Sequence, residues 1–255
     1  MRDLVESGRG SVVLGNHELG LLLVYAGLRA LRSTDTYADV LDASARDDWI
    51  EWLRGRPLAV TGCLGTRGES AAADADGAPV KRFAMVHASV HPDWDLTELE
   101  RRVRRAEARL ADPHAAGWRA FLSAREDPDH DTLERLVRCR SVMISDVFPD
   151  GRSWSSRPPE SRAESASVAW HRAWSARHHD YGIVYGHWAQ QGLHVEENLR
   201  GLDTGCVHHG RGRAGALTAW LPDPHARAPF ATPDDHFWHI PARRAYYAEK
   251  LAAES

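Results

Sequence analysis

The chain has 255 residues, of which 43% are hydrophobic and 27% are charged, and its formal net charge is −4. It is long enough to bury a large core, and its small net charge gives no basic surface of the kind that binds nucleic acid. It has no apolar run long enough to cross a bilayer, no secretory h-region after Met1, and three cysteines that are isolated in sequence. We therefore expect one large domain over residues 1–221, a polar tail with a short helix over residues 222–255, and a cytoplasmic location.

Along the chain, the first informative segment is Gly15-Asn16-His17-Glu18. It follows an apolar run that predicts a strand near residues 11–15, and it opens a pattern that predicts a helix near residues 18–32. The glycine lets the chain turn sharply, the Asn16 amide oxygen is a hard metal ligand, and His17 can bind metal or act as an acid. Taken alone, the segment is ordinarily explained by turn chemistry and a helix cap.

Two later strands also end in a histidine. The apolar run at 83–86 leads to His87, and the run at 181–185 leads to Gly186 and His187. In an open α/β sheet the carboxyl ends of the strands meet at one crevice. We therefore expect Asn16, His87 and His187 to converge there as metal ligands.

The remaining elements are predicted from apolar periodicity and from turn residues. A hairpin is expected from strands at 58–64 and 80–86, helices are expected at 96–110, 117–122 and 132–140, and strands at 201–203 and 216–221. The short helix of the tail is expected at 241–252. Only two of the 32 basic residues are lysines, so an arginine at any one position is weak evidence for phosphate binding.

Several motifs together resemble a known family. They are Gly15-Asn16-His17-Glu18, Val86-His87-Ala88, Gly186-His187-Trp188-Ala189, Leu202-Asp203-Thr204-Gly205-Cys206-Val207 and Leu217-Thr218-Ala219. In this order they resemble the symmetrical diadenosine tetraphosphatases, a bacterial branch of the calcineurin-like metallophosphoesterases. The resemblance implies an α/β sandwich of two mixed sheets flanked by helices, and it places the metallophosphoesterase domain at residues 1–221.

The resemblance also identifies motifs that this sequence does not contain. The family has two earlier motifs, of the forms Gly-Asp-x-His-Gly and Gly-Asp-x-x-x-Arg-Gly, and neither occurs in residues 1–255. We therefore expect the fold to lack its first strand-helix-strand unit. Asn16, His87 and His187 would then supply at most one half-site for metal, and we expect little activity from residues 1–255.

The chemistry implied by the resemblance is metal-dependent hydrolysis of diadenosine tetraphosphate into two ADP. The family uses two divalent cations, and mixed nitrogen and oxygen ligands suit Mn, Co, Fe or Zn. His17 is the candidate catalytic acid, and Arg138 and Arg140 are the candidate substrate-binding residues. The expected partner is a small dinucleoside polyphosphate, with no nucleic acid and no membrane, and the oligomeric state stays open. The alternatives are a metallophosphoesterase of broader specificity and a non-catalytic remnant that binds nucleotide or one metal.

Overall fold

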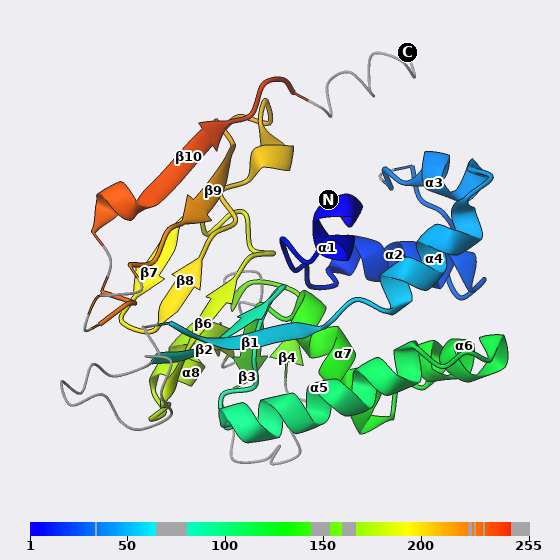
Figure 1. Ribbon diagram of the computed structural model, residues 1–255, viewed down its shortest axis with the longest axis horizontal. Helices are drawn as coiled ribbons and strands as arrows, with labels where there is room; N and C mark the ends of the chain where they lie inside the picture. Colours follow the sequence, from blue (N-terminus) through cyan, green and yellow to red (C-terminus); the bar gives the residue numbers. More distant parts are fainter. Residues whose placement is uncertain are drawn as a thin grey trace. The chain divides into compact units, whose positions relative to one another are not determined.

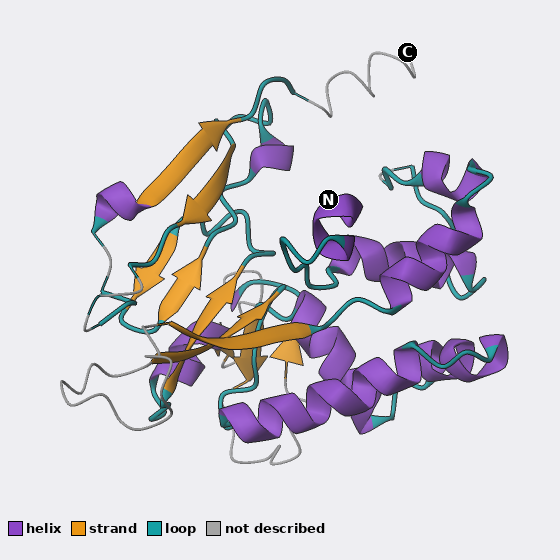
Figure 2. Cartoon of the chain, viewed as in Figure 1, coloured by secondary structure: helices purple, strands orange, loops and turns teal. Residues whose placement is uncertain are grey.

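The computed structural model describes residues 1–33, 35–64, 81–143, 154–159, 167–223, 226, 228–231 and 233–245. The chain divides into two compact units, residues 1–60 with 86–178 and residues 61–85 with 179–255, whose elements are labelled in Figure 1. The predicted α/β class with a mixed sheet is confirmed, and Figure 2 colours the helices and strands of both units. Within these described ranges, no helix is both long enough and apolar enough to cross a membrane.

The first unit is mainly helical. Its helices are α1 (Arg2–Glu6), α2 (Asn16–Tyr25), α3 (Ala38–Asp42), α4 (Arg46–Arg54), α5 (Leu96–Leu110), α6 (Ala115–Ser123), α7 (Pro128–Arg138) and α8 (Trp170–Ser175). A small antiparallel sheet has the order β4-β3-β5 and is formed by β3 (Ser141–Met143), β4 (Trp154–Ser155) and β5 (Ser167–Ala169). The predicted helix at 96–110 is confirmed as α5, and those at 117–122 and 132–140 correspond to α6 and α7.

Helix α5 packs against α6 and α7 through one apolar face. Its buried residues recur at helical spacing, at Leu99, Val103, Ala106 and Leu110. Both α5 and α7 begin at an aspartate that caps the helix: Asp95 accepts a hydrogen bond from the backbone N–H of Glu98, and Asp127 accepts one from that of Asp129. Capping and apolar periodicity together explain why the sequence predicted these helices well.

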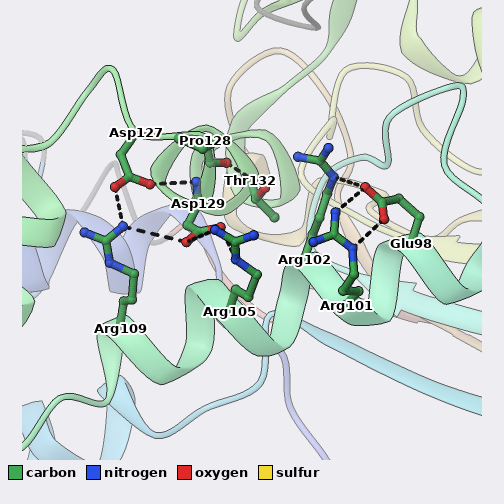
Figure 3. Close-up of polar contacts among 9 residues, drawn as sticks. All are labelled: Glu98, Arg101, Arg102, Arg105, Arg109, Asp127, Pro128, Asp129 and Thr132. Atoms are coloured by element: carbon green, nitrogen blue, oxygen red, sulfur yellow. Dashed lines mark hydrogen bonds and ion pairs between the residues drawn. The ribbon is translucent and has the colours of Figure 1, made fainter.

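The polar face of α5 carries ion pairs, drawn in Figure 3. Glu98 accepts hydrogen bonds from Arg101 and Arg102 of its own helix, at 2.7 and 2.6 Å. Further along, Arg105 pairs with Asp129 of α7 at 3.1 Å, and Arg109 pairs with Asp127. The arginine run of α5 therefore links two helices, in addition to forming pairs along one helix.

The second unit is built on a five-stranded mixed sheet of order β1-β2-β6-β8-β7. Its strands are β1 (Ala59–Leu64), β2 (Lys81–Val86), β6 (Tyr181–Tyr185), β7 (His194–Glu196) and β8 (Leu199–Gly201). Strands β2, β6 and β8 are parallel, and β7 is antiparallel to β8. Both strands of the predicted hairpin are present as β1 and β2, and their connection lies outside the described residues.

Residues 11–15 do not form the predicted strand. Gly15 has an extended backbone (φ −109°, ψ 178°) and Leu14 donates a hydrogen bond to the Pro57 carbonyl at 2.8 Å. No strand of the described chain pairs with this segment, so it lacks the ladder that defines a strand.

Helix α2 also ends earlier than predicted, at Tyr25. Gly27 adopts a left-handed conformation (φ 75°), and the N–H of Leu28 donates to the Leu23 carbonyl at 2.9 Å. These features form a Schellman motif, which stops an α-helix at a glycine. The predicted helix at 18–32 is therefore too long, because Gly27 ends it.

The segment after residue 221 contains a strand that the sequence did not predict. Strand β10 (Phe237–Pro241) pairs antiparallel with β9 (Ala216–Trp220), and Phe237 lies opposite Trp220. Pro241 is the last residue of this strand, and residues 246–252 of the predicted tail helix lie outside the described residues. Residues 237–241 are therefore part of a small second sheet of this unit and not an irregular tail.

Candidate metal and phosphate site

The loop before α2 presents Asn16 and His17 at the first turn of the helix. Gly15 is the N-cap residue, and its backbone N–H donates to a carboxylate oxygen of Glu18 at 3.1 Å. This contact fixes the direction in which the helix leaves the loop. Glu18 therefore serves as a capping residue, and Asn16 and His17 occupy the first exposed turn.

The loop after β2 is anchored to α7. The N–H of Ala88 donates to the Leu136 carbonyl at 2.7 Å, and the Ser89 hydroxyl donates to the Arg135 carbonyl at 3.0 Å. Ala88 and Ser89 are both buried. The position of His87, the preceding residue, is therefore set by the end of a strand and by the last turns of a helix.

Asn16 and His87 meet in the first unit. Nε2 of His87 lies 2.8 Å from Oδ1 of Asn16. The approach depends on Gly15, because a Cβ atom at this position would lie 2.9 Å from Cε1 and Nδ1 of His87. The glycine is therefore required by close packing against the imidazole ring, which a side chain would displace.

The pair fits a divalent cation in both geometry and charge. Two ligands about 2.0–2.2 Å from one cation and at right angles to each other are separated by roughly 3 Å, close to the 2.8 Å between these two atoms. Burial, together with the smaller effects of the charges of His17 and Arg140, lowers the pKa of His87 to about 4. A neutral imidazole offers a lone pair to metal, and the nitrogen and oxygen donors suit Mn, Fe, Co or Zn.

A cavity of about 200 Å³ adjoins this pair in the first unit. Asn16, His17 and Arg138 line it, so a candidate ligand, the candidate acid and a candidate phosphate-binding residue lie around one space. His17 is exposed, which leaves its ring accessible to a ligand in the cavity. The other lining residues are Gly20, Arg29, Arg32, Asp35 and Tyr37.

The sequence did not single out the arginines of this cavity. Arg29 is held by an ion pair with Asp35 at 2.9 Å and by hydrogen bonds to the Gly20 carbonyl at 3.3 Å and to Tyr37. Arg32 is exposed. The available signal was the location of Arg29 and Arg32 shortly after α2, but the high arginine content of the chain concealed it.

Arg140 lies at the start of β3, and it is not among the residues that line the cavity. Its backbone N–H donates to the Ser155 carbonyl at 2.8 Å, and its guanidinium donates to the Ser156 carbonyl at 2.6 Å. Of the two predicted substrate-binding arginines, the structure therefore places Arg138 beside His17 and gives Arg140 contacts to the β4 segment.

His187 belongs to the second unit and follows β6. Its φ angle is 68°, and it is the only non-glycine residue with a positive φ in the described part of the chain. Residues 82–85 of β2 lie opposite residues 181–184 of the parallel strand β6. A histidine held in the left-handed region costs free energy, and such strain clusters at functional sites.

The Leu202–Val207 motif forms a turn in the second unit. Asp203 accepts a hydrogen bond from the N–H of Gly205 at 3.0 Å, and Gly205 is left-handed (φ 73°). The Thr204 hydroxyl donates to the Ala216 carbonyl and lies close to the Thr218 hydroxyl, both at 2.6 Å. The polar side chains of this motif therefore connect the turn to β9.

Comparison with known proteins identifies the family of the chain. No family model matches the chain. Curated relatives of the chain carry the name symmetrical bis(5'-nucleosyl)-tetraphosphatase, and three of them illustrate the match. The relative from Ralstonia nicotianae is 33% identical over 224 residues, covering 84% of this chain and 72% of its own. Those from Burkholderia pseudomallei and a Janthinobacterium species are 34% and 35% identical, covering 89% and 82% of this chain and 76% and 73% of their own. At this identity and coverage, the chain belongs to the symmetrical bis(5'-nucleosyl)-tetraphosphatase family of hydrolases.

Proposed function

We propose that this protein hydrolyses a bis(5'-nucleosyl) tetraphosphate such as diadenosine tetraphosphate at its centre and releases two nucleoside diphosphates. The observation that supports this proposal most strongly is the Asn16–His87 pair, with donor atoms 2.8 Å apart, beside a cavity lined by His17 and Arg138. Metal ligands, an acid and a phosphate-binding cation are the groups that phosphoanhydride hydrolysis requires. The names of the relatives specify the substrate and the symmetrical cleavage.

The metal ligands in this proposal are Asn16, His87 and His187. His187 is a candidate because its strand is the parallel neighbour of β2, which leads to His87, and because its backbone is strained. A divalent cation bound there supplies Lewis-acid polarisation of the phosphate and lowers the pKa of a water molecule. Gly15 and the Ala88–Ser89 loop hold the ligands in place for this role.

His17 is the proposed general acid. Water attacks one of the two central phosphorus atoms, forms a new P–O bond to it and releases a proton to solvent, while the bond between this same phosphorus and the oxygen that bridges to the other central phosphorus breaks. The departing diphosphate oxygen takes a proton from the His17 imidazolium, which lies at the cavity wall next to Asn16. Arg138 binds phosphate oxygens of the substrate in the cavity, and we assign Arg140 a weaker role near the same phosphates.

We further propose that residues 1–255 hold the ligands of a single cation. The second cation of a two-metal site needs carboxylate ligands, and neither aspartate motif of the family occurs in these residues. Residues 1–255 alone should bind about one Mn²⁺ per chain and hydrolyse substrate slowly. Equilibrium dialysis followed by metal analysis measures this ratio, and two tightly bound cations per chain would contradict the proposal.

The function is tested by the identity of the products, which does not depend on rate. The protein is incubated with diadenosine tetraphosphate and Mn²⁺ or Co²⁺, and nucleotides are separated by chromatography. ADP as the only nucleotide product is expected, whereas AMP with ATP would refute symmetrical cleavage. His17→Ala should slow hydrolysis by about 100-fold or more, since a general acid typically contributes that much.

A matched control is His114→Ala. His114 is exposed, precedes α6 and makes no side-chain capping hydrogen bond. The His114→Ala variant should hydrolyse substrate at the wild-type rate. Comparable cleavage of simple phosphate monoesters would favour the alternative of a broader metallophosphoesterase, and nucleotide binding without any hydrolysis would favour the non-catalytic alternative.

A further inference from the structure

A second and larger cavity lies beside the one lined by His17. Its volume is about 570 Å³, within the range of small-molecule sites. Arg29, Arg32 and Arg138 line both cavities, so the two spaces adjoin in the first unit. The larger one extends from the end of α2 to the loop between α6 and α7.

The walls of this larger cavity combine cations with leucines. Leu23 lies near the end of α2, Leu28 follows this helix, and Leu122 lies near the end of α6. Leu28 keeps 42% of its surface exposed, although it is a large apolar residue. An exposed leucine at the wall of a cavity can pack against an apolar ligand surface, such as the face of a nucleobase or ribose.

The charges of the larger cavity are not balanced. Of its two carboxylates, Glu134 pairs with Arg138 at 3.1 Å, and Asp131 accepts a hydrogen bond from the Trp154 indole at 2.7 Å. Arg32 and Arg125 are exposed and have no carboxylate partner in the part of the chain that the structure describes. They come from different loops, so two uncompensated cations face one space.

We propose that the larger cavity binds a nucleoside diphosphate, the half of the substrate that extends away from His17. Arg32 and Arg125 bind its phosphates, and the leucine wall contacts the nucleoside. This proposal rests on the proposed function, since it assigns one end of the same substrate. The charge and shape of the cavity also predict that free ADP binds there without metal.

The direction of the substrate follows from the shared residues. Arg138 lines both spaces, so a phosphate chain that passes it has its centre beside Asn16 and His17 and one half extending toward Arg125. Arg32 lies at the junction of the two spaces for the same reason. Arg32 and Arg125 act by positioning the substrate, since neither is a proposed metal ligand or the proposed acid.

The test measures ligand binding in EDTA, apart from turnover. Isothermal titration calorimetry with ADP and with pyrophosphate is carried out on wild type, Arg32→Gln, Arg125→Gln and Leu28→Ser. Each arginine variant should weaken the binding of both ligands about tenfold or more, because a charge-assisted contact is lost. Leu28→Ser should weaken the binding of ADP but leave that of pyrophosphate unchanged.

Arg104→Gln is the matched control. Arg104 lies on α5 with 68% of its side chain exposed, and it lines neither cavity. The Arg104→Gln variant should bind ADP with the same affinity as wild type. Wild-type ADP affinity in Arg125→Gln, or equal effects of Leu28→Ser on ADP and pyrophosphate, would overturn the assignment. Asymmetric products in the hydrolysis assay would overturn the proposed function instead, and would leave the binding results as they are.

Discussion

Replacing Gly15 by alanine should damage the proposed metal site with little effect on the backbone. The backbone of Gly15 (φ −109°, ψ 178°) is one that any residue adopts, so the added strain is steric. The new Cβ would lie 2.9 Å from two atoms of the His87 ring and 2.7 Å from a carboxylate oxygen of Glu18. Carbon atoms pack at about 3.5 Å or more, so the ring must move by roughly 0.6 Å.

Such a shift moves Nε2 of His87 away from Oδ1 of Asn16 or tilts the imidazole ring relative to it. Overpacking of this kind costs about 1–3 kcal/mol of folding free energy. Disturbing the support of a metal ligand typically lowers affinity about 10-fold to 100-fold. Gly15→Ala should therefore have a lower melting temperature and a weaker Mn²⁺ affinity, measured by thermal unfolding and by calorimetry.

Gly55→Ala provides the control for this prediction. Gly55 follows α4, and a Cβ there meets its nearest neighbour, the Trp52 carbonyl oxygen, at an ordinary 3.6 Å. The Gly55→Ala variant should have a melting temperature and a metal affinity close to those of wild type. Wild-type affinity in Gly15→Ala, with the fold intact, would refute the argument that this glycine positions His87.

Two other predictions concern stability. Asp129→Asn removes the pairs with Arg105 at 3.1 Å and Arg109 at 3.7 Å, and should lower the free energy of unfolding by about 1 kcal/mol, less so in 1 M salt. Equal losses at low and high salt in urea titrations would argue against an ionic origin. Burial and the charge of Arg135 lower the pKa of His91 to about 4, below its usual 6.5. As the pH falls, the unfolded chain therefore binds a proton at His91 before the folded chain does. The free energy of unfolding should decrease as the pH drops from about 6.5 to about 4, and His91→Asn should reduce that loss. An unchanged pH profile in the variant would contradict this assignment.

The contact between Asn16 and His87 was predictable although 71 positions separate them. Each residue lies at the end of an apolar run and beside a small residue, and this local pattern occurs three times in the chain. The strand expected before Gly15 was wrong because a strand depends on a neighbour, which local periodicity does not reveal. The end of α2 was predictable in principle from Gly27, but the apolar pattern that continues to Leu31 obscured it.

The larger cavity was not predictable from the sequence. Arg32 and Arg125 are far apart along the chain, and neither has a motif that separates it from the other arginines. Only tertiary packing shows that Glu134 pairs with Arg138 and that Asp131 contacts Trp154, whereas the described residues offer no carboxylate partner to the guanidinium of Arg32 or Arg125. Strand β10 escaped prediction for a related reason, since Phe237–Pro241 is short and ends in proline, and its pairing partner β9 decides its conformation.

The left-handed backbone of His187 has a consequence for protein engineering. A non-glycine residue in this region costs about 1–2 kcal/mol, which glycine does not incur. His187→Gly should therefore regain part of this free energy while removing a proposed metal ligand. A selection for heat resistance alone would therefore enrich glycine at this position and return stable proteins that lack this proposed ligand, so directed evolution of this protein needs a catalytic screen at each round.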